Sequence, residues 1–146
     1  MEAKQITADD TRDIRFRVLW PHKDRMEDCV IDSDHLADAI HLGTFDGDRI
    51  VSVLSLFEME TPKLDFEKQY RLRVMGTDPL YGGRGAGKLI VELAKEIIRN
   101  KGYEVIWCDA RKVAIGFYEN LGFQMVGNWY DVPEIGPHKT MYFVLA

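Results

Sequence analysis

The sequence predicts a single α/β domain: one mixed central sheet of six to seven strands flanked by three to four helices. Three observations support this. A chain of 146 residues is long enough to bury one hydrophobic core and too short for two. Short β-rich runs alternate with runs of helical period. Their order along the chain reads β-α-β-β-β-α-β-α-β-β. We therefore expect one domain over residues 1–146, with helices on both faces of the sheet.

Each element is predicted from its own pattern. The helical runs follow apolar periodicity and end at Trp20-Pro21, at Gly102 or at Gly122. The predicted strands are residues 2–7, 41–45, 49–58, 69–77, 103–110, 123–130 and 139–145. The predicted helices cover the segment with Ile14, Val18 and Leu19 on one face, a short piece at 34–40, the segment after residue 88, and 112–121.

Two of these predictions are specific. Asp46-Gly47 between two β-rich runs predicts a type I′ hairpin turn, which needs positive φ at both central residues. The helix after residue 88 has a broad apolar stripe that includes Leu89 and Ile90, and its period places Lys95 on the opposite, polar face.

The composition excludes several classes of protein. Hydrophobic residues make up 46% and charged residues 29%, as in globular domains. The formal net charge of −5 disfavours nucleic acid as a partner and suits an amine-bearing substrate. Two distant cysteines, Cys29 and Cys108, fit a reducing compartment. The N-terminus has no apolar leader and no run approaches the ~20 residues of a membrane span, so we expect a cytoplasmic protein with no membrane partner.

The most informative local feature is a glycine turn between a predicted strand and the clearest helix, Gly82-Gly83-Arg84-Gly85-Ala86-Gly87-Lys88. A helix that begins there directs unpaired N–H groups and its positive dipole end at the turn, which favours a phosphate, and Arg84 could add a charge. A plain glycine-rich turn is the alternative. The dinucleotide pattern G-x-G-x-x-G fails in both registers. The P-loop pattern fails at Leu89, where Ser or Thr should ligate Mg²⁺.

The turn resembles the pyrophosphate loop of the GNAT superfamily of N-acetyltransferases, Gln/Arg-x-x-Gly-x-Gly/Ala. Gly85 and Gly87 fill the two glycine positions, whereas Gly82 departs from the opening Gln/Arg. A second block, residues 110–123, resembles the late A-x-x-F-Y-x-x-x-G-F motif of the same family. The resemblance covers residues 41–145 well and residues 1–40 in outline. It implies the GNAT fold and transfer of an acetyl group from acetyl-CoA to a primary amine of a small molecule or a protein.

The resemblance also assigns roles to residues. Backbone groups of the glycine turn would hold the diphosphate of coenzyme A, the main chain before it would pair with pantetheine, and Asp109 would contact pantetheine directly or through water. The implied cofactor-binding residues are Met75, Gly76, Thr77, Gly82, Gly83, Arg84, Gly85, Ala86, Gly87, Lys88 and Asp109.

Tyr118 is the predicted catalytic residue, because a phenol within reach of the sulfur is a suitable acid for the departing thiolate. Periodicity alone would favour a packing role for Tyr118, and the family motif reverses that preference. In some relatives a glutamate on the strand before the turn removes the amine proton, but that position is Arg71. The base stays open among Glu58, Glu60, His138 and a water chain.

Several alternatives remain. Cys108 raises a covalent two-step route, although direct attack by the amine in a ternary complex is preferred. His22, Trp129 and Tyr130 are candidates to line the acceptor site. The alternatives are a solvated loop position for His22, and packing in the core or at a dimer contact for Trp129 and Tyr130. His35 and His41 are assigned to the surface or to packing. No metal is expected, because Cys29 lacks ligand spacing with the histidines. A non-catalytic CoA-binding sensor, a P-loop-like nucleotide-binding protein and a homodimer are kept as alternatives.

Overall fold

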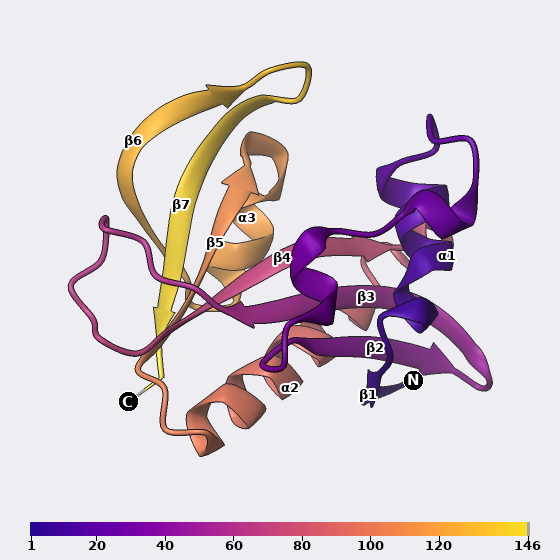
Figure 1. The fold of residues 1–146 in the computed structure, drawn as a ribbon, viewed down its shortest axis with the longest axis horizontal. Coiled ribbons are helices and arrows are strands. Elements are labelled where there is room, and N and C mark those ends of the chain that lie inside the picture. The colour runs from indigo at the N-terminus through magenta and orange to yellow at the C-terminus, as the bar shows by residue number, and fades with distance from the viewer. Residues whose placement is uncertain (146) are drawn as a thin grey trace. The chain divides into compact units, whose positions relative to one another are not determined.

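The structure is a computed structural model that describes residues 1–145. The chain divides into two compact parts: residues 1–57 with 72–96, and residues 58–71 with the chain from residue 97 onward. The strands form one sheet in the order β1-β2-β3-β4-β5-β7-β6 (Figure 1). They are β1 (Glu2–Ile6), β2 (Ile40–Asp46), β3 (Arg49–Glu58), β4 (Gln69–Thr77), β5 (Val105–Arg111), β6 (Gln124–Val132) and β7 (Gly136–Val144). The α-helices are α1 (Arg12–Ile14), α2 (Ala86–Asn100) and α3 (Ile115–Asn120). The predicted mixed α/β class and element order are confirmed.

Helices cover both faces of the sheet in the first part. On one face the Thr44 hydroxyl of β2 donates to the Ala86 carbonyl at 2.7 Å, at the start of α2. On the other face Arg15, in the π-helical turn Arg15–Leu19 that continues α1, donates to the Ser55 hydroxyl of β3 at 3.0 Å. Thr44 pairs with Ser52, three residues from Ser55, so the two contacts lie on opposite faces.

The hairpin between β2 and β3 has a different turn from the one predicted. Asp46 pairs with Arg49, so the two central residues are Gly47 and Asp48. Of these two, Gly47 has positive φ, at 62°. Glycine at the first central position is typical of a type II′ turn, and the predicted type I′ turn is wrong.

Two helix predictions also need correction. The predicted helix at 34–40 is a 3-10 turn, Asp32–His35, and Ile40 already belongs to β2. The Asp34 carboxylate accepts from the Ile31 N–H at 3.0 Å, which closes the turn locally instead of extending a helix. In α2, Lys95 is only 6% exposed, whereas Leu89 is 36% exposed. Lys95 buries its stem and donates to Glu92 at 3.1 Å.

The second part is built on the antiparallel pairs β5–β7 and β6–β7. The first three residues of β4 pair in parallel with β5, from Gln69 opposite Val105 to Arg71 opposite Trp107. The β6–β7 hairpin is longer than predicted, reaching Val132 and resuming at Gly136. Its register shifts between Val126 and Tyr130.

Candidate active site

The glycine turn is held at its start by a carboxylate. Asp78 caps the 3-10 turn Pro79–Tyr81 by accepting from the Leu80 N–H at 3.0 Å. Its other donors are the guanidinium groups of Arg17 at 3.1 Å and Arg49 at 3.2 Å. The backbone hydrogen bond from Leu80 is the main cause that lowers the pKa of Asp78, with Arg17 and Arg49 adding to it. The turn therefore begins from an ionised, well-anchored residue.

The glycines at the centre of the turn adopt conformations that other residues avoid. Gly83 has φ 73° and Gly85 has φ 87°, and a Cβ at either position would meet open space. The helical hydrogen bonds begin with the Leu89 N–H, which donates to the Gly85 carbonyl at 3.1 Å. Helix geometry thus leaves the N–H groups of Ala86, Gly87 and Lys88 without an intrahelical acceptor. Bare backbone and free N–H donors at a helix start suit a diphosphate.

Arg84 lies beside this turn. Its guanidinium sits 4.7 Å from the centre of the Tyr81 ring, and the Tyr81 hydroxyl donates to Asp46 at 2.5 Å. Arg84 is exposed, so its charge is accessible to an anion at the turn.

The end of β4 contains a feature that the sequence did not reveal. Val74 has φ 47°, a left-handed conformation that is costly for a β-branched residue, and it directly precedes Met75, Gly76 and Thr77. The Ser52 hydroxyl contacts the Gly76 carbonyl at 3.2 Å and the Thr77 hydroxyl at 2.7 Å. The strand is therefore distorted next to the residues predicted to pair with pantetheine.

The predicted acid, Tyr118, is buried in the second part. Its ring stacks edge-on against the Phe117 ring, with 5.2 Å between the ring centres, and the centre of the Phe123 ring lies 5.3 Å away. Burial, followed by the neighbouring Cys108 thiol, raises the pKa of Tyr118 well above its ordinary value. Burial likewise raises the pKa of Cys108, with Asp109 adding to it. At neutral pH both groups hold their protons, so the phenol is a proton donor and the thiol is not a ready nucleophile.

Asp109 follows Cys108 on β5 and turns to the opposite face of the sheet. Its carboxylate accepts from Arg71 at 2.9 Å and from the Thr140 hydroxyl at 2.8 Å. The Tyr130 hydroxyl also hydrogen-bonds to the Asp109 carboxylate. Burial is the main cause that raises the pKa of Tyr130, and this hydrogen bond is the second cause. Asp109 and Arg71 thus form one polar cluster. Arg71, which stands where some relatives have a glutamate, is ion-paired with Asp109.

The candidate bases have different surroundings. Glu58 accepts a hydrogen bond from the Tyr103 hydroxyl, and Glu60 is exposed. His138 is buried, with Nδ1 2.9 Å from the Gly136 carbonyl. Of the other histidines, His22 is exposed. None of these contacts singles out a base.

The remaining predicted residues are two aromatic side chains of β6 and the two buried cysteines. Trp129 is exposed, with the Lys139 ammonium 5.1 Å from the centre of its ring, and Tyr130 is half-buried. Cys29 and Cys108 are both free thiols. Among residues 1–145, no group of three His, Cys, Asp or Glu side chains lies close enough to hold a metal ion.

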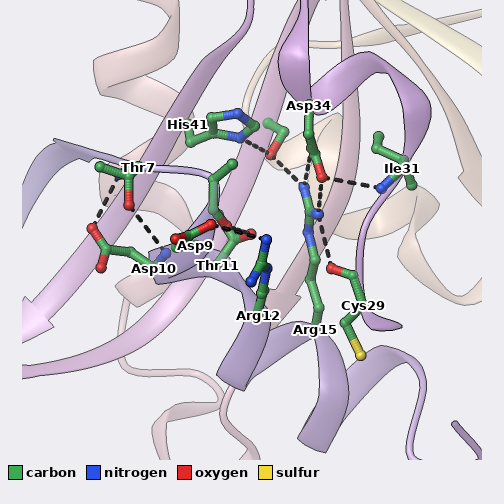
Figure 2. Close-up of polar contacts among 12 residues, drawn as sticks. Thr7, Asp9, Asp10, Thr11, Arg12, Arg15, Cys29, Ile31, Asp34 and His41 are labelled. Atoms are coloured by element: carbon green, nitrogen blue, oxygen red, sulfur yellow. Dashed lines mark hydrogen bonds and ion pairs between the residues drawn. The ribbon is translucent and has the colours of Figure 1, made fainter. Parts of the chain in front are cut away.

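A buried ion pair in the first part was also missed by the sequence analysis (Figure 2). Arg15 donates to both Asp34 oxygens, at 2.7 and 2.9 Å, and to the Cys29 carbonyl at 3.2 Å. Ser55 joins this guanidinium to His41, whose Nδ1 lies 2.7 Å from the hydroxyl. Burial lowers the pKa of His41. The network fastens the segment around residues 29–34 to the sheet.

The predicted site residues therefore fall into two groups. Met75–Thr77 and Gly82–Lys88 belong to the first part, and Asp109 and Tyr118 belong to the second. Within the second part, Tyr118 approaches one face of β5 through Cys108, and Asp109 occupies the other face.

Comparison with known proteins identifies the class of protein. The model of the acetyltransferase (GNAT) family matches residues 4–123. The chain is also 35% identical, over 99% of its length and 97% of the relative's, to the uncharacterized N-acetyltransferase YitI of Bacillus subtilis (strain 168). The chain belongs to the GNAT acetyltransferase family, and the prediction of an N-acetyltransferase enzyme is confirmed at the level of the family.

Solved structures share the fold. An aminoglycoside 6'-N-acetyltransferase complexed with coenzyme A matches with a TM-score of 0.79 at 14% identity, covering 100% of this chain and 98% of that one. The ribosomal-protein-S18-alanine N-acetyltransferase from Escherichia coli matches with a TM-score of 0.72 at 15% identity, covering 99% and 93%. A putative N-acetyltransferase from Lactobacillus plantarum matches with a TM-score of 0.77 at 19% identity, covering all of both chains.

No helix in residues 1–145 has the length and apolar character needed to cross a membrane.

Proposed function

We propose that the protein transfers an acetyl group from acetyl-CoA to a primary amine of a small-molecule or protein acceptor, by direct attack in a ternary complex. We also propose that residues 1–146 act as a single N-acetyltransferase domain. Family membership supports the acetyl transfer, and the residues of the chain support the assignment of roles. Acetyl-CoA supplies the activated acetyl group, and the protein must bind it, orient it and provide a proton.

The glycine turn carries this proposal. Free N–H groups at the start of α2, positive φ at Gly83 and Gly85, and the accessible charge of Arg84 together suit the diphosphate of coenzyme A. The departure at Gly82 removes a side-chain contact but no backbone donor. In this assignment the distorted end of β4, at Met75–Thr77, offers main-chain groups to the pantetheine arm.

Tyr118 is proposed to donate the proton to the departing thiolate. The phenol is protonated over the whole neutral range, as an unperturbed tyrosine also is, and it lies beside Cys108. The protonated state of Cys108 supports direct attack by the amine over a covalent intermediate on the protein.

A thermal-shift comparison followed by an amine panel tests the proposal. At a hundredfold excess over Kd a ligand adds ~2.7 kcal/mol to the free energy of unfolding. We expect acetyl-CoA and CoA to raise Tm by several degrees and Mg-ATP to leave it unchanged. The panel should reveal release of free thiol that requires both acetyl-CoA and an amine. Stabilisation by Mg-ATP alone would support the P-loop reading instead.

The alternative of a non-catalytic CoA-binding sensor has one observation in its favour, the tight aromatic packing of Tyr118. The variant Tyr118→Phe separates the two functions because it retains the ring and removes the hydroxyl. An acetyltransferase should lose at least tenfold in kcat while its affinity for CoA holds. A sensor should bind CoA and show no acetyl transfer with either form.

A further inference from the structure

The second part of the chain contains a cationic cluster whose two basic residues, Lys63 and Arg71, have no role in the proposed chemistry. We define it as Lys63, Arg71, Asp109, Tyr130 and Thr140. These residues come from β4, β5, β6, β7 and the segment between β3 and β4. Their contacts link them through Asp109, which accepts from Arg71 and Thr140, and through Thr140, which accepts from Lys63 at 2.9 Å.

Lys63 is held in place along its whole length. A Cβ at Gly127, where β6 is irregular, would lie 3.5 Å from its Cδ, so the stem of Lys63 passes directly over this glycine. Its ammonium lies 4.4 Å from the centre of the Tyr130 ring and donates to Thr140. Among residues 1–145, no carboxylate forms an ion pair with Lys63. An ammonium fixed on an aromatic ring and a neutral hydroxyl retains an unneutralised charge.

Arg71 also has unused hydrogen-bonding capacity. One terminal nitrogen donates to Asp109, and the other donates to the weakly accepting sulfur of Met59, at 3.3 Å. Its Nε is buried and has no hydrogen-bond partner in the part of the chain that the structure describes. The guanidinium lies 4.8 Å from the centre of the Trp107 ring, which fixes its plane. The side chains of Arg71 and Asp109 remain 21% and 25% exposed, so the cluster is accessible.

The cluster has a net positive charge, whereas the chain as a whole has a net negative charge. Lys63 and Arg71 contribute two positive charges and Asp109 one negative charge, a surplus of one cation in a protein with a net charge of −5. Such a local surplus, with fixed donors, is the chemistry that recognises a carboxylate.

We propose that the cationic cluster binds a carboxylate of the acceptor, so that the substrate is an amino acid or a closely similar amino carboxylate. This inference rests on the proposed N-acetyltransferase function. Asp109 adjoins Cys108, which contacts Tyr118, so the cluster and the proposed acid occupy opposite faces of the same strand. In this arrangement Lys63 is the specificity residue that meets the carboxylate, and Arg71 is ion-paired with Asp109 beside it.

Matched acceptor pairs test the proposal. Lysine and cadaverine, histidine and histamine, and tyrosine and tyramine each differ by the carboxyl group, and phosphoethanolamine offers a phosphate instead. We expect the wild-type enzyme to acetylate at least one amino acid with kcat/KM tenfold or more above its decarboxylated partner. Lys63→Gln should raise KM for that amino acid by about tenfold to a hundredfold, the loss of one charge-assisted hydrogen bond, and leave KM for the decarboxylated partner unchanged.

Lys68→Gln is the matched control, since Lys68 is in the same segment with its ammonium 5.7 Å from the centre of the Tyr103 ring, outside the cluster. It should behave as wild type with every acceptor. The carboxylate site is overturned if Lys63→Gln raises KM equally for both members of a pair. It is also overturned if the wild-type enzyme prefers the decarboxylated amine or phosphoethanolamine. In either case the acetyltransferase function stands.

Calorimetry with the same amino acids and CoA gives a readout that does not need turnover. Saturable binding of an amino acid that weakens in Lys63→Gln and persists in Lys68→Gln supports the site. If none of the amino acids binds, the site is overturned. Binding of an amino acid without acetyl transfer from acetyl-CoA would instead count against the proposed function.

Discussion

Removing one partner of the buried pair between Arg15 and Asp34 should destabilise the protein strongly. The two side chains are 0% and 1% exposed, and they share two charge-assisted hydrogen bonds. Burial raises the pKa of Asp34, but the hydrogen bonds from Arg15 and the Ile31 N–H outweigh it, and the pKa lies below its usual value. Asp34→Ala leaves the guanidinium buried without a counter-charge, which costs about 3–5 kcal/mol.

Thermal unfolding measures this loss directly. For a chain of this size 1 kcal/mol corresponds to roughly 2–4 °C, so Tm should fall by about 6–20 °C. Asp28→Ala is the matched control, because Asp28 pairs with Arg25 at 3.4 Å in the same segment and both side chains are exposed. That variant should lose less than about 1 kcal/mol. Equal Tm values for the two variants would refute the argument that burial of the charge sets the cost.

Three further predictions concern the turn, the buried histidine and the acid. Gly85→Ala places a Cβ on a residue at φ 87°, so KM for acetyl-CoA should rise severalfold while KM for the amine stays constant; steady-state kinetics would contradict this if only the amine KM changed. Burial lowers the pKa of His41, so the unfolded chain takes up a proton at this residue at a higher pH than the folded protein does. The contribution of the neutral, buried His41 to stability is therefore present above the unfolded pKa near ~6.5 and is lost as pH falls. Melting curves from pH 7.5 to 5 should show this decline in the wild type and a weaker one in His41→Gln; identical slopes would refute it. Because the pKa of Tyr118 is raised, kcat should show no alkaline decline from this residue up to pH ~10, and a decline that Tyr118→Phe abolishes would contradict the assignment.

Most of the fold follows from patterns that act over short distances. The amphipathic period predicts α2, and the alternating and apolar runs predict all seven strands within a few residues. The errors arise where tertiary contacts override local preference. Asp34 closes a 3-10 turn because Arg15 lies beneath it, and the hairpin shifts by one residue because the pairing of Asp46 with Arg49 leaves Gly47 first in the turn.

The candidate site is harder to predict from the sequence than the fold is. Glycine spacing and the late motif predict the turn and Tyr118, because both depend on residue types in a contiguous segment. The conformation of Val74 has no sequence signal, since valine is among the least suitable residues for positive φ. Lys63 is separated from Thr140 by 77 positions, and only the folded sheet brings them together.

The central claim is that main-chain N–H groups of the glycine turn bind the diphosphate of coenzyme A. A titration of ¹⁵N-labelled protein with CoA, followed by amide resonances, tests it most directly. The amide signals of Gly83, Gly85, Ala86, Gly87 and Lys88 should move together and saturate with a single Kd, whereas those of the β2–β3 turn at Gly47 should stay in place. If CoA binds and the turn amides do not shift, the binding mode described here is wrong.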